Sequence, residues 1–469
     1  MVIIIAGSVV ISSVLSFLAD GLSGGTLSAL LFGNRSFGKL YSVYRTLLSD
    51  YLYPVDSNTL VEGALKGMAQ STNDPYTVYM PPSQAASFHE GLSDQYEGIG
   101  AQVEQVGEAI VLTPMKGSPA EKAGMRPGDQ LISVDGKTVA GQPVDEIVSK
   151  IKGPAGTKVT VGVRRDDNPQ IIQLTITREA IPLQSVITKR YSDQTVLVQI
   201  TQFGEDTGDK LKQQLQTLNK QGLSGLVLDM RGNPGGYLST VQEIGDLLLP
   251  KGAVLYRLVD RDGHEQVARS NGSTIPFHVP IVVLMDGNTA SAAEILAAAL
   301  HDSAQAPLVG THSFGKGIAQ TEETFGDGSS LKYTQLKWLT PKGVWIQGKG
   351  LQPDYPVAAP SWASLPPLQK LPLQPNTTGD DVATAQKMLR ALGMSVDRTD
   401  GYFDASTQQA VATFQQRHGL APTGSIDTQT AMALQDALTQ KAKEEDPQLA
   451  KARQVLAGIL GQSYAQGAA

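Results

Sequence analysis

The spacing of hydrophobic residues changes several times along the 469-residue chain, and each change marks a different kind of structural unit. Between residues 36 and 70, apolar side chains recur at i, i+3 and i+4, which predicts one helix and then a second one capped by Ser57. Residues 96–180 contain short β-like runs and one clear helix at 143–152. From residue 181 to about 360, apolar strands alternate with helices, which predicts a layered α/β unit. The stripe on the first helix comprises Leu40, Val43, Tyr44, Leu47, Leu48 and Tyr51.

The chain opens on an uncharged apolar run, residues 2–19, whose 18 residues are near the lower limit for a membrane-spanning helix. A signal peptide and a buried soluble helix are the alternatives. However, no basic residue precedes Arg35, and Ala19 makes a poor cleavage site. The same lack of basic residues leaves the orientation undetermined by charge. We expect residues 1–33 to anchor the chain in a membrane, with the rest outside the cytoplasm.

A serine stands at a predicted strand-to-helix turn in the α/β unit. Residues 281–286 form an apolar, β-branched run that predicts a buried strand, and an alanine-rich helix follows over 292–300. Ser291 therefore presents its hydroxyl at the end of a sheet, where a substrate can reach it. The amide of Ala292 and the helix N-terminus add partial positive charge for an oxyanion.

Lys316 supplies a candidate general base for this serine. It stands between Gly315 and Gly317, and Gln320 follows four residues later. A lysine can accept a proton near neutral pH if burial lowers its pKa from about 10.4 towards 7 or 8. The Gln320 carbonyl could aim the amine, because it accepts a hydrogen bond without adding a charge that would raise the pKa again. The alternative is a solvated loop lysine.

The serine also has an ordinary structural explanation, and a histidine could replace the lysine as base. Ser291 and Glu294 form a capping box, which would make Ser291 only a helix cap. His301 follows Ser291 on the same helix at about 15 Å, which is too far for a base. His312 is the remaining rival, although no carboxylate that would orient it is evident. We expect His312 and Asp302 at the surface.

A second strand-to-turn segment precedes the serine. Residues 225–230 predict a buried strand, and it leads into the sequence RGNPGGYL at residues 231–238. Gly235 and Gly236 would let the backbone approach a ligand closely. A phosphate-binding loop would be followed by G-K-[ST], which is absent here, so we reject nucleotide binding. A plain β-turn remains the alternative.

Composition removes several classes of function. The net charge of −7 argues against nucleic acid as the main partner. The chain has no cysteine, which excludes disulfides, a thiol nucleophile and cysteine-ligated zinc. Its six histidines are scattered without an H-E-x-x-H sequence, so we expect neither a metal site nor a cofactor.

Several segments together resemble the signature of the carboxy-terminal processing proteases, also called tail-specific proteases. They are LDMRGNPGG, GNTASAAEI and SFGKGIAQ, and DPYTVY at residues 74–79 resembles a further family segment. The resemblance implies a ClpP/crotonase-like layered β/α protease core over residues 181–360. The site residues that it implies are the nucleophile Ser291, the base Lys316, its orienting partner Gln320, and the oxyanion-hole amides of Ala292 and of Gly235 or Gly236.

Residues 96–180 resemble a PDZ domain of the bacterial protease type, inserted before the core. The GIGA loop, GSPAEKAG and RPGDQLISVDG carry the resemblance, and a strand at 158–164 completes the module. It implies a β-sandwich-like module to which a free carboxyl terminus adds as a strand, with Ile99, Gly100 and Ala101 as contacts. The alternative is a rigid lid with an empty groove.

Beyond the core, residues 361–375 are rich in Pro, Leu and Ser and predict a linker. Residues 376–440 resemble a small three-helix peptidoglycan-binding domain, in TGDDVATAQKMLRALG, DGYFDASTQQAVATFQQRHGL and TGSIDTQTAMAL. Such a domain binds wall glycan or serves as an interaction surface, and both functions stay open. Residues 441–469 predict one charged helix with a frayed tail.

These features together predict a serine endopeptidase anchored in the membrane of a bacterial cell envelope. Its substrates would be proteins or peptides with free carboxyl termini, and its activity could serve signalling. Peptidoglycan and a second copy of the chain are further expected partners, since the helices of residues 34–95 could form a dimer arm or pack on the core. A scaffold of PDZ and wall-binding modules with an inactive core, and a Ser–Lys amidase acting on wall peptides, are the rival functions.

Overall fold

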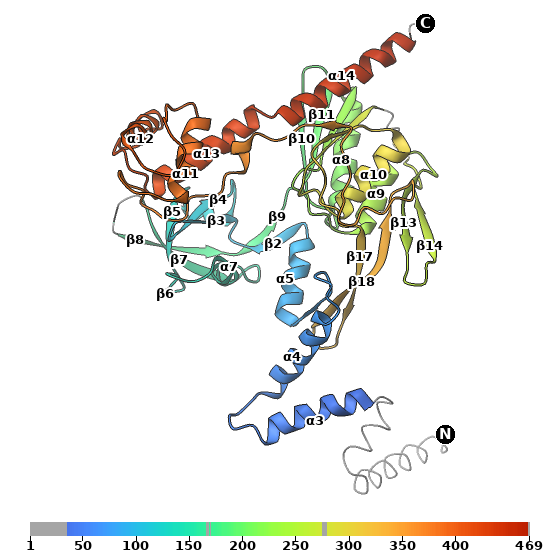
Figure 1. Ribbon diagram of the computed structural model, residues 1–469, viewed down its shortest axis with the longest axis horizontal. Helices are drawn as coiled ribbons and strands as arrows, with labels where there is room; N and C mark the ends of the chain where they lie inside the picture. Colours follow the sequence, from blue (N-terminus) through green and yellow to red (C-terminus); the bar gives the residue numbers. More distant parts are fainter. Residues whose placement is uncertain (1–34, 166–167, 169, 274–278, 468–469) are drawn as a thin grey trace. The chain divides into compact units, whose positions relative to one another are not determined.

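The computed structural model describes residues 35–165, 168, 170–273 and 279–467 (Figure 1). The predicted membrane anchor, residues 1–33, lies outside this part of the chain. Two compact units divide the chain: residues 1–87 with 320–335, and residues 88–319 with 336–469. Across the described residues, no helix combines the length and the apolar character needed to cross a bilayer.

The first unit consists of helices and a small antiparallel sheet. Its elements are α3 (Arg35–Ser49), α4 (Ser57–Gln70), β1 (Val78–Met80), and parts of α5 (Pro82–Leu92), β17 (Ile318–Thr324) and β18 (Ser330–Leu339). β1 pairs antiparallel with β18, with Val78 opposite Lys332. The N-cap of α4 is Asp56 and not Ser57, because the Asp56 carboxylate accepts a hydrogen bond from the Thr59 N–H at 2.9 Å.

The predicted apolar stripe on α3 remains largely exposed. Leu40, Val43, Leu47 and Leu48 keep between 36% and 51% of their surface accessible. Tyr51, which the sequence placed in the same stripe, lies just after the end of α3 and is 52% exposed. An amphipathic helix normally buries this face against a neighbour. Among the described residues, no neighbour covers most of this apolar face of α3, so it is accessible to a binding partner.

The PDZ-like module of the second unit is a six-stranded sheet with two helices. Its elements are β3 (Ala101–Val106), β4 (Ala109–Pro114), α6 (Pro119–Lys122), β5 (Asp129–Val134), β6 (Lys137–Thr138), α7 (Val144–Ile151), β7 (Lys158–Arg164) and β8 (Ile171–Thr177). The order β3-β4-β5-β7-β8, with β6 beside β5, leaves β3 at one edge. The chain enters and leaves through the antiparallel pair β2 (Gln95–Gly98) and β9 (Glu179–Pro182).

The predicted α/β core is built on a six-stranded sheet in the order β10-β11-β12-β15-β16-β19. Its strands are β10 (Val186–Arg190), β11 (Thr195–Ile200), β12 (Gly225–Asp229), β15 (Ile281–Met285), β16 (Leu308–Gly310) and β19 (Tyr355–Pro356). β11 to β19 run parallel, and β10 pairs antiparallel with β11. One face packs against α8 (Thr207–Lys220), α9 (Leu238–Leu248) and α10 (Ala292–Ala304).

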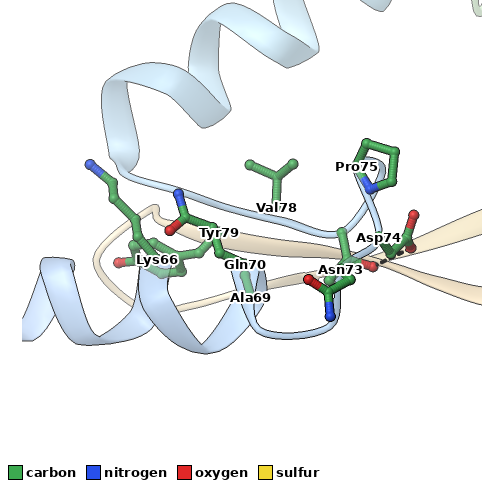
Figure 2. A pocket seen from close by; sticks show the side chains of 9 residues that line it. Lys66, Ala69, Gln70, Asn73, Asp74, Pro75, Val78 and Tyr79 are labelled. Atoms are coloured by element: carbon green, nitrogen blue, oxygen red, sulfur yellow. Dashed lines mark hydrogen bonds between the residues drawn. The ribbon is translucent and has the colours of Figure 1, made fainter.

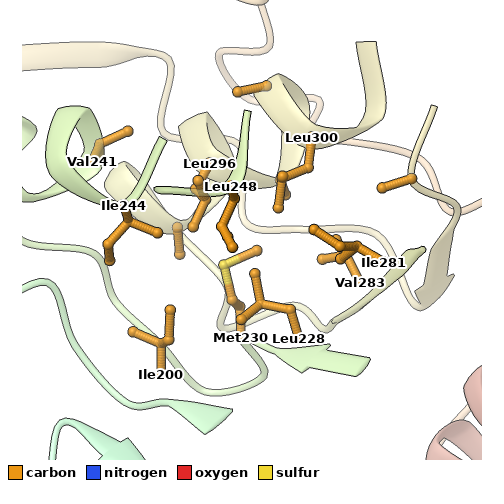
Figure 3. Packing of buried hydrophobic residues seen from close by; sticks show 14 of the residues in the cluster. Ile200, Leu228, Met230, Val241, Ile244, Leu248, Ile281, Val283, Leu296 and Leu300 are labelled. Atoms are coloured by element: carbon orange, nitrogen blue, oxygen red, sulfur yellow. The ribbon is translucent and has the colours of Figure 1, made fainter. Parts of the chain in front are cut away.

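Figure 3 shows the core between this sheet and helices α9 and α10. The buried side chains it labels are Ile200, Leu228, Met230, Val241, Ile244, Leu248, Ile281, Val283, Leu296 and Leu300. The carboxyl ends of parallel strands meet at one edge of a sheet, and binding segments gather there. β12 and β15 are neighbours, so the segments that follow Asp229 and Met285 emerge next to each other.

A second sheet completes the core, formed by β13 (Val254–Val259), β14 (Glu265–Arg269) and the end of β18. β13 pairs antiparallel with both neighbours. Trp338 of β18 lies opposite Leu258 and is fully buried in the main hydrophobic cluster. The second sheet thereby places Trp338 next to the segment that carries Lys316. The Trp338 indole N–H donates a hydrogen bond to the Lys316 carbonyl.

The carboxyl-terminal module has the three predicted helices and a short 3-10 helix before them. They are η1 (Ser361–Ser364), α11 (Asp380–Ala391), α12 (Ala405–Arg417) and α13 (Thr428–Glu444). The segment 361–375, predicted as a linker, packs against the module, because Leu368 and Leu373 are buried in its hydrophobic cluster. Leu373 also forms an isolated antiparallel β-bridge with Ile426. The same buried cluster includes Val106, Ala109 and Val111 of the PDZ-like module.

The last helix, α14 (Pro447–Gly467), covers the second face of the core sheet. The buried side chains at this contact are Val227, Val282, Leu284, Val309, Ala452 and Leu456. Parallel sheets are normally covered on both faces, and α14 provides this cover on the second face. The sequence predicted a single helix with a frayed tail here. Instead α13 ends at Glu444, and Asp446 caps α14 by accepting a hydrogen bond from the Leu449 N–H at 2.9 Å.

Candidate active site

Ser291 lies in the turn between β15 and α10, with φ at 56° and ψ at −119°. A positive φ is uncommon for a residue with a side chain and costs on the order of 1–3 kcal/mol. The neighbouring Thr289 fixes this turn, because its hydroxyl donates to the Met230 carbonyl at 2.9 Å. Ser291 is therefore held in a sharp turn between a buried strand and a helix N-terminus.

The Glu294 carboxylate connects the Ser291 turn to the Lys316 loop, and its residue is fully buried. Oε2 accepts hydrogen bonds from the N–H of Ser291 and the N–H of Lys316, each at 2.9 Å. Oε1 accepts from the Gly315 N–H at 2.6 Å and from the Ser313 hydroxyl. Glu294 reaches back to the Ser291 N–H as in a capping box, and the same carboxylate also fixes the lysine loop. A capping role and a chemical role of Ser291 are thus compatible.

Two tryptophans hold the backbone on the far side of Lys316. The Trp338 indole N–H donates to the Lys316 carbonyl at 2.8 Å, and the Trp345 indole N–H donates to the Gly317 carbonyl at 2.8 Å. The Gly317 N–H donates to Gln347 Oε1 at 2.7 Å. These bonds fix the loop backbone from both sides without using the lysine side chain.

Both glycines beside Lys316 are needed because the loop of residues 345–350 packs directly against them. A Cβ on Gly315, where φ is +88°, would lie 2.7 Å from the Gly350 nitrogen. A Cβ on Gly317 would lie 2.7 Å from the nitrogen of residue 347. The glycines therefore permit a close approach of two backbones and do not merely loosen the loop.

The turn after β12 lies against Ser291. Asn233 shapes this turn: its side-chain amide donates to the Ile200 carbonyl at 2.7 Å, and its Oδ1 accepts from the Gly235 N–H at 2.8 Å. A Cβ on Gly235 would lie 2.9 Å from the Ala292 nitrogen and from the Ser291 Cβ. Gly235 thus permits the close approach, while its own N–H is committed to Asn233.

Gly236 and Ala292 carry the other predicted oxyanion amides. Gly236 forms a parallel bridge with Phe203, and a Cβ there would lie 2.2 Å from the Phe203 carbonyl oxygen. Within the described residues, no hydrogen-bond acceptor is found for the N–H of Gly236 or of Ala292. Of the two glycines, Gly236 is the better placed donor, and its role stays a prediction.

Gln320 lies in β17 and belongs to the first unit, whereas Lys316 belongs to the second. The Gln320 side-chain amide donates to Thr334 Oγ1 on β18 at 3.2 Å. Its predicted partnership with the Lys316 amine joins residues of both units, so this role remains a prediction.

The histidines occupy other surroundings. His301 lies in the last turn of α10, with Nδ1 2.9 Å from Asp302 and Nε2 3.4 Å from Asp354. His312 is exposed, as expected. Asp302 is not the predicted surface residue, because only 8% of its side chain is exposed. Burial acts to raise the pKa of Asp302, but hydrogen bonds from His301 and neighbouring donors outweigh burial and lower it.

The predicted peptide-contact loop lies at the start of the edge strand β3. The Ile99 carbonyl accepts from the Ala120 N–H at 2.9 Å, and the Ile99 side chain is buried in the module. A Cβ on Gly100 would lie 2.5 Å from the Ser118 Cβ. Ala101 begins β3, whose outer edge has no paired strand among the described residues. An added peptide strand could pair along this edge.

A hollow of about 390 Å³ lies on α4 and the DPYTVY segment, and Figure 2 shows the side chains that line it. The Asp74 carboxylate there accepts hydrogen bonds from the Tyr76 N–H at 3.0 Å and from the Thr77 hydroxyl at 2.7 Å. These bonds close a tight turn between α4 and β1. The aspartate of this family-like segment thus has a structural role, and the hollow contains none of the predicted site residues.

At the β13–β14 hairpin, Asp260, Asp262 and His264 place one ligand atom each within 4.8 Å of one another. The Asp260 carboxylate already accepts from the N–H groups of Asp262 and His264, each at 2.9 Å. The cluster is explained by the hairpin turn.

Sequence reasoning missed several residues that hold the site. Glu294 was visible only as part of a capping box. Trp338 was expected to be a packing residue, and it is fully buried, but its hydrogen bond to the Lys316 carbonyl was not foreseen. The Asp446 contact with the turn after β12 was also missed, because Asp446 is 215 residues from Arg231 in the chain.

Comparisons with known proteins find family models and relatives that match the chain. The chain matches the models of peptidase family S41 over residues 194–357, a PDZ domain over 110–165, a putative peptidoglycan binding domain over 378–434, and the activating protease CtpB N-terminal domain over 26–83. The carboxy-terminal processing protease CtpA of Bacillus subtilis is 39% identical over 456 residues, which cover 97% of each chain. CtpB of the same organism is 38% identical over 88% of this chain and 87% of its own. Among solved structures, the photosystem II D1 C-terminal processing protease is 29% identical, with a TM-score of 0.44, over 72% of this chain and 94% of its own.

Proposed function

Since the chain belongs to peptidase family S41 and is a serine protease of the carboxy-terminal processing type, we propose that Ser291 is its nucleophile and Lys316 its general base. The observation that carries the proposal is the shared Glu294 carboxylate. Its Oε2 accepts from the backbone N–H of both residues, each at 2.9 Å. The two residues therefore lie on adjacent backbone segments, which a serine–lysine dyad requires.

In this mechanism the Ser291 hydroxyl attacks the carbonyl carbon of the scissile peptide bond. Lys316 takes the hydroxyl proton and then gives it to the leaving amine, which leaves an acyl-enzyme on Ser291. Water hydrolyses this ester with the same lysine as base. Gln320 is the proposed partner that aims the Lys316 amine.

The oxyanion of each tetrahedral intermediate would be bound by the backbone N–H groups of Ala292 and Gly236. Support comes from the close approach of the turn after β12 to Ser291, and from the helix N-terminus behind Ala292. The Gly235 N–H donates to Asn233 at 2.8 Å, so Gly235 would act by its small size and not as a donor.

The proposal is tested by incubating the full chain with casein and, separately, with muropeptides. We expect casein cleavage, read as released peptides by mass spectrometry, and a rate within about threefold of wild type for His312→Ala, since an exposed surface substitution usually has little effect. Cleavage of muropeptides alone would support the amidase instead. A large loss of activity in His312→Ala would indicate that His312, and not Lys316, is the general base.

A second prediction concerns the glycine before the lysine. We expect Gly315→Ala to lower kcat by about 10- to 100-fold, because the new Cβ would push the Lys316 loop away from Gly350 and misalign the amine. Gly343→Ala is the matched control: φ is similar, +82°, but no atom lies within 4 Å of its Cβ. Steady-state kinetics of both variants measure the difference, and equal losses would contradict the steric explanation.

Substrate recruitment is the proposed task of the PDZ domain. The outer edge of β3, which pairs with no other strand in the described part of the chain, and the loop of Ile99, Gly100 and Ala101 support capture of a carboxyl-terminal tail as an added strand. The substrates would be proteins with loose carboxyl-terminal tails, and their cleavage could serve signalling outside the cytoplasm.

The remaining parts of the proposal concern location and assembly. The uncharged run at residues 2–19 supports a membrane anchor with the protease on the extracytoplasmic side of a bacterial envelope. The match of residues 378–434 to a peptidoglycan-binding domain supports contact with the wall. The exposed apolar stripe on α3 supports a homodimer, because a second copy would bury it.

A further inference from the structure

Arg231 joins the catalytic segment to the last helix of the chain. It lies two residues after the end of β12 and directly before the turn that carries Gly235 and Gly236. All five guanidinium N–H groups find acceptors. Nε donates to Asp229 Oδ1 at 2.9 Å, and one terminal nitrogen donates to Asp229 and Asp446, each at 2.7 Å. The other donates to Asp446 and to Gln448, each at 3.0 Å.

The guanidinium is largely buried, with 20% of the side chain exposed. Burial acts to lower the pKa of Arg231, but the hydrogen bonds to Asp229 and Asp446 outweigh burial and raise it. A guanidinium held by two bidentate carboxylates has little freedom to move. One of these carboxylates comes from the strand β12, and the other comes from the cap of α14.

The residues that follow Arg231 connect it to the Ser291 turn through hydrogen bonds of the backbone. The next residue, Gly232, donates its N–H to Asp286 Oδ1 at 2.9 Å, at the end of β15. The Ala290 N–H donates to the Asn233 carbonyl at 2.9 Å. A shift of Arg231 would therefore strain the hydrogen bonds that set the turn after β12 against the Ser291 turn.

Helix α14 has other anchors that do not involve Arg231. Its apolar face is buried on the sheet, and Arg453 pairs with Asp193 at 3.0 Å while its guanidinium lies 3.8 Å from the centre of the Tyr191 ring. These contacts hold α14 on the sheet without Asp446. The hydrogen bonds between Asp446 and Arg231 can therefore act on the turn after β12 and are not needed only to dock the helix.

We infer that Asp446 is a positioning residue for the proposed oxyanion site: its carboxylate, presented by the cap of α14, holds Arg231 and thereby the turn that carries Gly236. The inference rests on the proposed function, because the turn matters for chemistry only if Ser291 is the nucleophile. It assigns a part of peptide-bond hydrolysis to a segment outside the protease core. Without the Asp446 carboxylate, two N–H groups of Arg231 lose their acceptors, and the turn gains freedom.

The test uses the full chain and four variants, with an internally quenched peptide as substrate. We expect Asp446→Asn to lower kcat by about 10- to 100-fold and to leave KM within about twofold, since a misplaced oxyanion donor acts on the transition state. Asparagine remains a good N-cap for α14. This variant therefore weakens the hydrogen bonds to Arg231 while it keeps the helix cap. Asp446→Glu, which restores both oxygens, should recover part of kcat.

Asp193→Ala is the matched control, because it removes the other carboxylate paired with α14 but does not contact Arg231. A peptide aldehyde adds a second readout, since its hemiacetal oxygen occupies the oxyanion site. Its affinity should fall in Asp446→Asn by the same factor as kcat, and stay unchanged in Asp193→Ala. Unchanged kcat in Asp446→Asn, or equal losses in both variants, would overturn the inference. Activity that survives Ser291→Ala would instead remove the proposed function itself.

Discussion

Replacing Lys316 by alanine is expected to lower kcat for peptide cleavage by on the order of 10³- to 10⁴-fold, to the residual level of Ser291→Ala. A nucleophile and its base act as one unit, so loss of either removes nearly all of the covalent pathway. The backbone of this loop is held by Glu294, Trp338 and Trp345, and none of these contacts uses the lysine side chain. The substitution should therefore leave the fold intact, which thermal unfolding monitored by circular dichroism can verify.

Lys316→Arg makes the same prediction sharper. Arginine keeps the positive charge on a long, flexible side chain, but it cannot give up its proton near neutral pH. We expect it to be as inactive as Lys316→Ala. Lys349→Ala, an exposed lysine in the loop that packs on Gly315, should retain wild-type rates. An active Lys316→Arg would rule out the lysine as a base.

The second large effect is expected for Glu294→Gln. The buried carboxylate accepts from Ser291, Ser313, Gly315 and Lys316, and a glutamine places an NH₂ group where one oxygen accepts two of these bonds. Each donor left without an acceptor costs about 1–3 kcal/mol. We expect kcat to fall by about 10²- to 10³-fold, because the serine and lysine segments separate. The free energy of unfolding of the core should fall as well.

Steady-state kinetics and chemical denaturation of the same preparation measure both effects. Glu265→Gln is a suitable control, since this glutamate forms only a partly exposed ion pair with Arg257. A Glu294→Gln variant with wild-type kcat would show that the serine and the lysine keep their alignment without the shared carboxylate.

Local sequence patterns predicted the elements that carry the site, because each depends on near neighbours. The apolar run at 281–286 and the alanine-rich segment after it correspond to β15 and α10, with Ser291 in the turn between them. The predicted strand 158–164 has the bounds of β7, and the predicted helix 143–152 contains α7. Periodicity suffices in these segments since the buried face repeats within a few residues.

What the sequence could not predict depends on contacts between distant segments. The capping box pointed to Glu294 as a helix residue, but its bonds to Gly315 and Lys316 exist only once the chain has folded. Asp302 looked like a surface charge because its burial comes from contacts such as the hydrogen bond of the Lys342 N–H, 40 residues away. The proline-rich segment 361–375 looked like a linker, yet Leu368 and Leu373 pack into the carboxyl-terminal module.

Because α14 follows every other described element in the chain, the ribosome completes it after all of them. Until then one face of the core sheet is bare and Arg231 lacks the Asp446 carboxylate. On the role inferred for Asp446, a nascent chain cannot reach full proteolytic competence before its closing helix has docked.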